Sequence, residues 1–169
     1  MRARRRTGIA FGMTLLLMLQ AGLAMAADCM QGHAVYTDSE KTYEIVFEPV
    51  DSDAASSSHR FTMTVRNTDL VLDGYVMPSE PVDRPNGMLF FHCPDGDVTG
   101  DDLRACTIWQ GIIYTHDDGK IGLLPASGNK AAAEILLPGL GSSIRDSSLW
   151  ETGKLSVTPW DVLTFKECR

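Results

Sequence analysis

The feature that most constrains the fold is a period-two alternation of apolar and polar residues in two segments of the chain. In residues 42–47 every second side chain is aromatic or aliphatic, and residues 60–66 repeat the pattern with arginine and threonine in between. Side chains of a strand point alternately to its two faces, so each segment predicts a strand with one buried and one hydrated face. The hydrated face with Arg60 and Arg66 is either a binding surface or simply solvated. The polar stretch 51–58 joins the two strands as a long-looped hairpin.

Further apolar and aromatic runs predict more short strands. They lie at residues 69–77 (with a break at Gly74), 88–92, 107–114, 121–124, 155–158 and 162–166. About eight short strands separated by turn residues predict an all-β fold, mainly antiparallel, built as a small barrel or sandwich.

One region departs from the strand pattern. Residues 129–137 hold good helix formers after Asn129, which is suited to a helix cap, and the run ends before Pro138. The apolar end of this run, residues 135–137, fits a strand equally well. Ser142 or Ser143 is suited to begin a second short helix, ending near Leu149. We therefore expect one or two short helices between residues 130 and 149.

Residues 1–26 have the pattern of a secretory signal. Four arginines precede an apolar run at residues 9–19, and Ala24 and Ala26 supply the small residues that a signal peptidase reads. The run is shorter than the roughly 20 residues that cross a bilayer, which disfavours the alternative of a retained anchor. The sequence therefore predicts a periplasmic or secreted protein, with residues 27–169 as a single β-domain and no membrane span after cleavage.

The charge of the predicted domain bears on its partners. Because the leader holds four arginines and no acidic residue, residues 27–169 carry 22 acidic and 11 basic side chains, a net charge of −11. Such a chain is ill suited to nucleic acid or to anionic membrane surfaces. A cationic protein or an envelope component is the expected partner, although acidity also serves solubility alone.

All four cysteines follow the leader, and an even number in an exported chain indicates two disulfides. Of the three possible connectivities we favour the nested one, Cys93–Cys106 around a short Asp/Gly-rich loop and Cys29–Cys168 between the two ends of the domain. Facing strands around the short loop would pair Phe90 with Trp109 and Phe91 with Ile108. Neighbouring cysteines are at least 13 positions apart, so the paired spacing of a zinc site is missing.

The loop at residues 95–102 carries carboxylates at alternate positions followed by glycine, as calcium loops do at their start. The twelfth place of such a loop needs a bidentate Glu but holds Cys106, which excludes a helix-loop-helix site. A looser Ca²⁺ site remains a hypothesis, with the candidate ligands Asp95, Asp97, Thr99 and Asp101. The alternative is an exposed loop whose aspartates cap its own turns. No other cofactor is expected.

Two histidines lie near the ends of predicted strands, where a metal site or a proton relay is conceivable. They are His92 and His116, and Asp117 and Asp118 follow the second. A histidine at such a position is more often an exposed surface group.

The sequence favours a binding role over catalysis. The S-x-x-K pattern at residues 127–130 lacks the K-T-G partner of penicillin-interacting enzymes, and no nucleophile elbow or phosphate loop is complete. We therefore expect a non-catalytic exported module, such as an inhibitor of a cationic enzyme or an envelope accessory domain. The alternative is a small metal-dependent or His/Asp hydrolase, which needs His92 and His116 in one pocket. An outer-membrane barrel needs strands of about ten residues, and several predicted strands are shorter.

Overall fold

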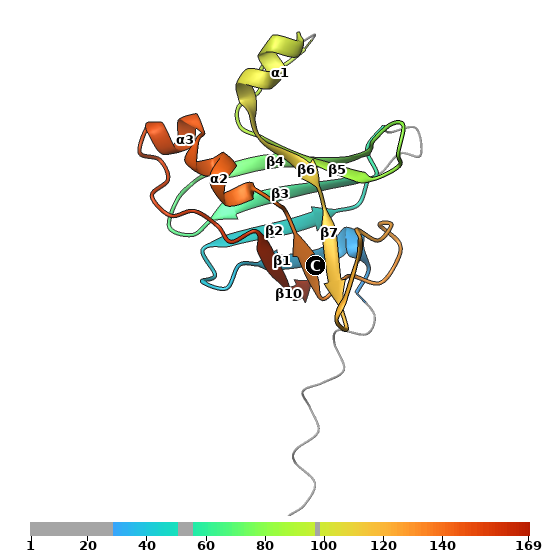
Figure 1. The fold of residues 1–169 in the computed structure, drawn as a ribbon. Coiled ribbons are helices and arrows are strands. Elements are labelled where there is room, and N and C mark those ends of the chain that lie inside the picture. The colour runs from blue at the N-terminus through green and yellow to red at the C-terminus, as the bar shows by residue number, and fades with distance from the viewer. Residues whose placement is uncertain (1–28, 51–55, 97–98) are drawn as a thin grey trace, which may run out of the picture.

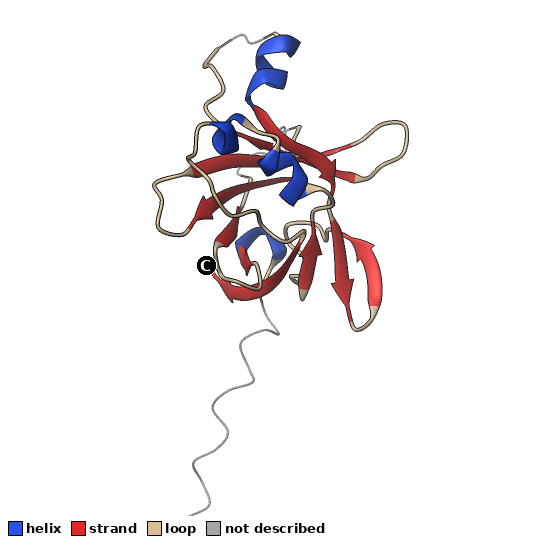
Figure 2. Ribbon diagram, turned by 60° about the vertical axis from the view of Figure 1, so that its left-hand side comes forward, coloured by secondary structure: helices blue, strands red, loops and turns tan. Residues whose placement is uncertain are grey.

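The structure is a computed structural model that describes residues 29–50, 56–96 and 99–169. The predicted leader lies outside these residues. Within them, ten antiparallel strands form one sheet that curls into a half-barrel (Figures 1 and 2). The strands are β1 (Ala34–Thr37), β2 (Tyr43–Glu48), β3 (His59–Val65), β4 (Val71–Pro78), β5 (Pro85–Phe90), β6 (Thr107–Ile112), β7 (Tyr114–Asp117), β8 (Lys120–Leu123), β9 (Glu134–Leu136) and β10 (Val162–Cys168). The all-β prediction is confirmed, with slightly more strands than expected.

The order of the strands explains the curl. Across the sheet they run β6-β5-β4-β3-β2-β1-β10-β9-β7-β8, so β6 and β7 lie near opposite ends although only Ile113 separates them in the chain. The predicted strand 107–114 is therefore two strands. Ile113 is fully buried, and its N–H donates to the Pro85 carbonyl at 3.0 Å. One residue thus ties the two ends of the sheet together.

The core fills the inner side of the curl. The apolar sides of β2 and β3 point inward, as the alternation predicted, and the inner side chains of the other strands join them. Two short helices, α2 (Leu140–Arg145) and α3 (Ser148–Glu151), lie over this side in Figure 1 and add Leu140, Ile144 and Leu149 to the core. The opposite side of β1–β5 is the hydrated one, and it is called the outer face below.

Gly74 does not break its strand as expected. It lies opposite Phe61 in the middle of β4, and an added Cβ there would meet the Phe61 ring at 2.1 Å. The glycine is therefore needed for the close approach of an aromatic ring, and backbone pairing continues on both sides of it.

The predicted helix at residues 129–137 is wrong, and its strand alternative is correct in part. Residues of β9 pair with β10 on one side and with β7 on the other, so backbone hydrogen bonds to two neighbours outweigh the local helix preference of the alanines. The helices begin later, and Asp161 accepts the N–H groups of Gly139 (2.7 Å) and Gly141 (3.0 Å) where α2 starts.

The acidic loop ends in a helix that the sequence analysis missed, α1 (Gly100–Cys106). Thr99 accepts the N–H of Asp102 at 3.3 Å, and the Asp102 carboxylate accepts the N–H of Thr99 at 3.0 Å, which makes a capping box. The hydrogen bonds from Thr99 hold the pKa of Asp102 below its usual range. The remaining helix is the short 3₁₀ turn η1 (Gln31–His33).

The structure contains the nested disulfides, Cys29–Cys168 and Cys93–Cys106. The second one joins the residues after β5 to the end of α1. Two disulfides fit a protein that folds in an oxidising compartment.

The expected aromatic pairs beside the short loop are wrong. Leu89 lies opposite Trp109 and Phe90 lies opposite Thr107, with a register shift between them, so neither Phe90 nor Phe91 has its predicted partner. The prediction assumed two regular strands leading into the disulfide. The chain instead enters β6 directly from α1, and the backbone N–H of Phe91 donates a hydrogen bond to the Cys106 carbonyl.

The expected strand at residues 155–158 is also wrong. This segment is a loop, held by burial of Leu155 and by a hydrogen bond from the Tyr43 hydroxyl to the Val157 carbonyl. Among the described residues, no helix has the length and apolar character needed to span a bilayer.

Candidate functional site

A pocket on the outer face, near the turn between β1 and β2, brings together several cationic side chains. The buried Asp38 shapes this turn, because its carboxylate accepts the N–H groups of Thr42 (2.7 Å) and Tyr43 (2.9 Å). Burial, with a further contribution from the charge of Asp38, raises the pKa of Tyr43 to about 12. Lys41 completes the turn with φ 56°, a conformation that glycine adopts more readily than lysine.

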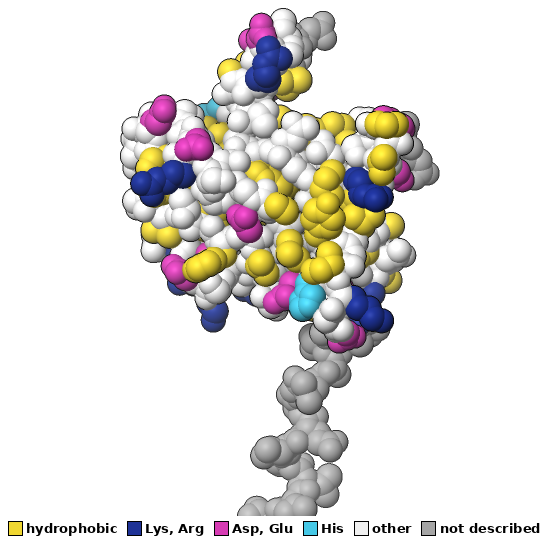
Figure 3. Space-filling model, viewed as in Figure 1, with side chains coloured by type: hydrophobic (Ala, Val, Ile, Leu, Met, Phe, Trp, Pro, Cys, Tyr) yellow, Lys and Arg dark blue, Asp and Glu magenta, His cyan; other side chains and the backbone are white. Residues whose placement is uncertain are grey.

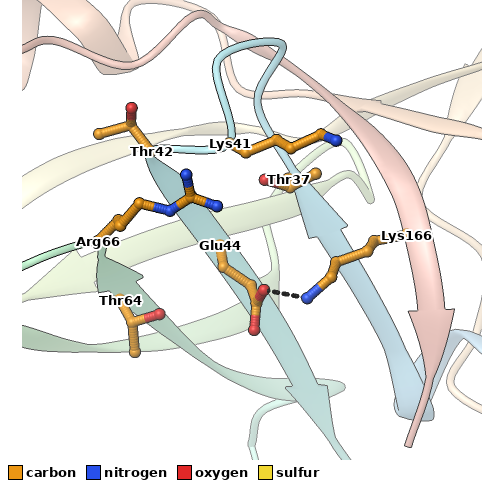
Figure 4. A pocket seen from close by; sticks show the side chains of 7 residues that line it. All are labelled: Thr37, Lys41, Thr42, Glu44, Thr64, Arg66 and Lys166. Carbon is orange, nitrogen blue, oxygen red and sulfur yellow. Dashed lines mark hydrogen bonds and ion pairs between the residues drawn. The ribbon is translucent and has the colours of Figure 1, made fainter.

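The pocket, called the basic pocket below, has a volume of about 260 Å³. Its lining comes from β1, β2, β3, β10 and the adjoining turns, so residues far apart in the sequence meet there (Figure 4). The lining residues are Thr37, Lys41, Thr42, Glu44, Thr64, Arg66 and Lys166.

One carboxylate in the basic pocket is already shared by two cations. Glu44 contacts the Lys166 ammonium at 2.7 Å and the Arg169 guanidinium at 3.0 Å. The hydrogen bond to Glu44, helped by Glu167, raises the pKa of Lys166, which therefore stays charged. Lys41 and Arg66, in contrast, form no ion pair with any residue that the structure describes. The pocket therefore carries positive charge that its own side chains leave unneutralised.

The threonines add hydroxyl groups between these cations. The Thr37 hydroxyl donates to the Tyr43 carbonyl at 2.9 Å, which fixes its orientation. Those of Thr42 and Thr64 donate to no other group in the described part of the chain, so they are available to a ligand. A pocket rich in N–H and O–H donors, with two unpaired cations, is suited to the oxygens of a carboxylate, sulfate or phosphate.

The histidines singled out from the sequence lie far apart. His92 follows β5 and stacks on the ring of Phe91 (centroids 3.9 Å apart), whereas His116 is on β7, where its Nδ1 lies 2.8 Å from the Glu134 carboxylate. The strands next to them, β5 and β7, lie near opposite ends of the strand order, and the cleft that His92 lines does not include His116. Asp117 accepts the N–H of Ala133 at 2.7 Å, so it acts in the pairing of β7 with its neighbour.

Of the four candidate calcium ligands, two are engaged in other contacts, one lies outside the described residues and one lines a cleft. Asp97 is not described, Thr99 caps α1, and Asp101 pairs with Arg104. Asp95 lines a second cleft on the outer face. In the described ranges, no three His, Cys, Asp or Glu side chains are grouped so that they could hold a metal ion.

Two further buried polar side chains, Gln31 and His59, lie outside the basic pocket. Gln31 accepts hydrogen bonds from the Tyr36 hydroxyl (2.9 Å) and from the N–H of Ala132 (3.2 Å). His59, 2% exposed, lies 3.0 Å from the Ser58 hydroxyl, and burial lowers its pKa, opposed by the Pro125 carbonyl.

Apolar side chains gather on another surface, seen over β7 and its neighbours in Figure 3. In register across four strands lie Val162, Leu136, Tyr114 and Leu123. The first and last are each 40% exposed. The row does not reach the basic pocket and brings no charged group of its own, so it does not define a ligand.

The sequence analysis found only part of the basic pocket. It noted Arg66 on a hydrated face, but it singled out neither Lys41 nor Lys166, because these residues meet only once β1, β2, β3 and β10 are paired. No residue pattern in the sequence indicates that Lys41 has a positive φ. Comparisons with models of protein families, with curated proteins and with solved structures found no match to this chain.

Proposed function

We propose that the chain is a non-catalytic binding domain of an exported protein, periplasmic or secreted, whose basic pocket holds an anionic group of its partner. The observation that carries this proposal is that Lys41 and Arg66 line the same polar pocket, and neither forms an ion pair within the described residues. In a chain with 22 acidic and 15 basic residues, a locally positive pocket runs against the overall charge.

The physical basis is electrostatic attraction supported by hydrogen bonding. An oxyanion in the pocket gains charge-assisted hydrogen bonds from the guanidinium of Arg66 and the ammonium of Lys41, which are stronger than bonds between neutral groups. Acidic groups elsewhere repel anions, so only a ligand that fits the pocket is retained. Envelope components with carboxylate, sulfate or phosphate groups have the required chemistry.

The hydrolase alternative has less support. It depends on His92 and His116 acting together, and these residues occupy separate parts of the sheet. A binding role does not require the two histidines to lie together, and it uses the basic pocket as it is seen in the structure.

Isothermal titration of the oxidised protein with inorganic phosphate, sulfate and citrate at low ionic strength tests the proposal. We expect millimolar or tighter binding that weakens as KCl is added, because salt screens the attraction. Arg66→Gln and Lys41→Gln should each weaken binding by about fivefold, close to 1 kcal/mol. Arg84→Gln, at an exposed position outside the pocket, is the matched control and should bind like the wild type.

Two results would overturn the proposal. One is absence of binding for all three anions at low ionic strength. The other is an equal loss of affinity in Arg84→Gln and Arg66→Gln, since this would show attraction by overall charge without a defined pocket.

A further inference from the structure

A second cleft lies on the same outer face, at the opposite end of the strands from the basic pocket. It has a volume of about 560 Å³, within the range of ligand pockets. The floor comes from β3, β4 and β5, and the wall comes from the disulfide loop and α1, which rises from the upper edge of the sheet in Figure 1. The lining residues of this aromatic cleft are Arg60, Asp73, Tyr75, Phe90, His92, Cys93, Pro94, Asp95 and Leu103.

The apolar part of the cleft is built by two rings and a helix. Tyr75 and Phe90 lie with ring centroids 6.3 Å apart and planes inclined by 52°, on neighbouring strands. Leu103 faces the cleft from α1 and is 40% exposed, although a leucine is usually buried. A long side chain that enters the cleft can therefore contact apolar groups on two of its sides.

The wall of the cleft is held in place covalently. The Cys93–Cys106 disulfide links the two ends of the loop, and the N–H of Phe91 donates to the Cys106 carbonyl at 2.9 Å. The capping box at Thr99 begins α1 at a defined residue. The disulfide and the capped start of α1 therefore position Leu103 beside the sheet.

Among the residues that line the cleft, two carboxylates, Asp73 and Asp95, face one guanidinium, Arg60. Arg60 lies 3.6 Å from the Glu48 carboxylate and 3.9 Å from that of Asp73, so one guanidinium is shared between two carboxylates. Asp95 adds a third carboxylate, and it forms no ion pair within the described residues. This end of the face is therefore negative, whereas the basic pocket is positive.

We propose that the aromatic cleft receives a lysine or arginine side chain of a protein partner. The aliphatic stem packs against Phe90 and Leu103, and the cation lies near the ring of Tyr75 and the carboxylates of Asp73 and Asp95. Charge complementarity selects this occupant, because an anionic group would meet the two carboxylates that line the cleft, Asp73 and Asp95, of which Asp95 is unpaired among the described residues. Arg60 already places a guanidinium of this chain in the cleft, opposite Tyr75 across the β3–β4 pair and 3.9 Å from the Asp73 carboxylate.

The proposal goes beyond the anion-binding function and does not depend on it. The two sites have opposite charge and share no residue. A protein with complementary basic and acidic groups can engage both, whereas an acidic polysaccharide fits only the basic pocket. A cationic protein partner also agrees with the overall acidity of the chain.

The test is an amide NMR titration of the oxidised protein with Nα-acetyl-arginine N-methylamide, with the matching glutamate compound and methyl glucoside as comparison probes. We expect the arginine probe to shift amides of Tyr75, Phe90 and Leu103, and the other two probes to leave them unchanged. Asp95→Asn and Leu103→Ala should each lower the affinity for the arginine probe by about threefold. Asp118→Asn, an exposed acid remote from the cleft, should bind like the wild type.

Each other outcome overturns the proposal. Shifts with methyl glucoside alone would assign the cleft to a sugar. Shifts scattered over all exposed acids and unchanged in Asp95→Asn would show attraction by overall charge. Absence of shifts with the arginine probe at low ionic strength would show that the cleft does not receive this side chain. Asp95 and Leu103 are exposed, so both variants should retain the fold, and the unperturbed amides of β1 and β2 report this in the same spectra.

Discussion

The inner and outer faces of β3 differ in what determines the role of their side chains. Inward, Phe61 and Met63 are fully buried in the core, where hydrophobic burial dictates the residue type. Outward, Arg60 and Thr64 lie at opposite ends of the strand and line two different pockets. The inner face depends on an alternation within one strand, whereas the function of the outer face depends on which strands lie beside it. Stability and binding should therefore respond to different residues of one strand.

The largest expected effect is on the inner face. Phe61→Ala removes a fully buried ring that packs on Gly74 and Phe47, and such truncations cost about 3–5 kcal/mol. Thr62→Ala, its outward neighbour, should change the free energy of unfolding by about 0.5 kcal/mol or less. Urea unfolding followed by tryptophan fluorescence measures both. Equal effects of the two substitutions would contradict the distinction between the faces.

A smaller loss is expected where the core approaches the backbone. Gly74→Ala places a Cβ at 2.1 Å from the Phe61 ring, so the ring must move, and overpacking of this kind costs about 1–3 kcal/mol. Gly128→Ala is the control, because a Cβ there meets nothing within 4 Å and the backbone is not left-handed. Urea midpoints of the two variants compare them directly, and an unchanged midpoint in Gly74→Ala would show that the ring does not rest on this glycine.

The buried histidine makes stability depend on pH. Burial lowers the pKa of His59 below the ordinary 6.5, so the unfolded chain binds the proton more readily than the folded one. Above pH ~6.5 the neutral His59 side chain makes its full contribution to the free energy of unfolding. This contribution is lost as the pH falls from there toward the folded-state pKa, by at most about 1.4 kcal/mol per pH unit.

Chemical unfolding between pH 7.5 and pH 5 measures this slope. His59→Gln should flatten the profile, whereas His33→Gln, at an exposed position, should keep it. A profile that stays steep in His59→Gln would assign the dependence to another group.

The smallest effect on stability is expected at the basic pocket, with opposite signs for stability and binding. Lys41 has φ 56°, so Lys41→Gly relieves backbone strain and should stabilise the protein slightly, by about 1 kcal/mol at most. The same substitution removes a cation from the pocket and should weaken phosphate binding. Asn67→Gly, also at positive φ (62°) but outside the pocket, should leave binding unchanged. If Lys41→Gly binds phosphate as the wild type does, Lys41 is not part of the site.

Much of the fold was predictable because it follows from local patterns. The alternation at β2 and β3 correctly indicated the buried side chains, and the spacing of the cysteines favoured the pairing that the structure contains. Predictions failed where pairing with segments distant in the sequence determines the local structure. The alanines before β9 favour a helix locally, but pairing on both sides makes the following residues a strand.

The candidate sites were less predictable for the same reason. Asp95 was noted as a candidate calcium ligand and His92 as part of a metal site or proton relay, yet both line a cleft whose other walls come from β4 and α1. Arg66 was recognised only as part of a hydrated face. Its neighbours Lys41 and Lys166 are 125 positions apart in the sequence, and no local pattern relates them.

The central claim is that the outer face of the sheet is the binding face. The most direct measurement is amide chemical-shift mapping of the oxidised protein during titration with inorganic phosphate at low ionic strength. The account predicts saturable shifts confined to the residues around Lys41, Glu44, Thr64 and Arg66, with α1 and β7 unaffected. Shifts centred on the apolar row of β7–β10, or no saturable shifts anywhere, would contradict it.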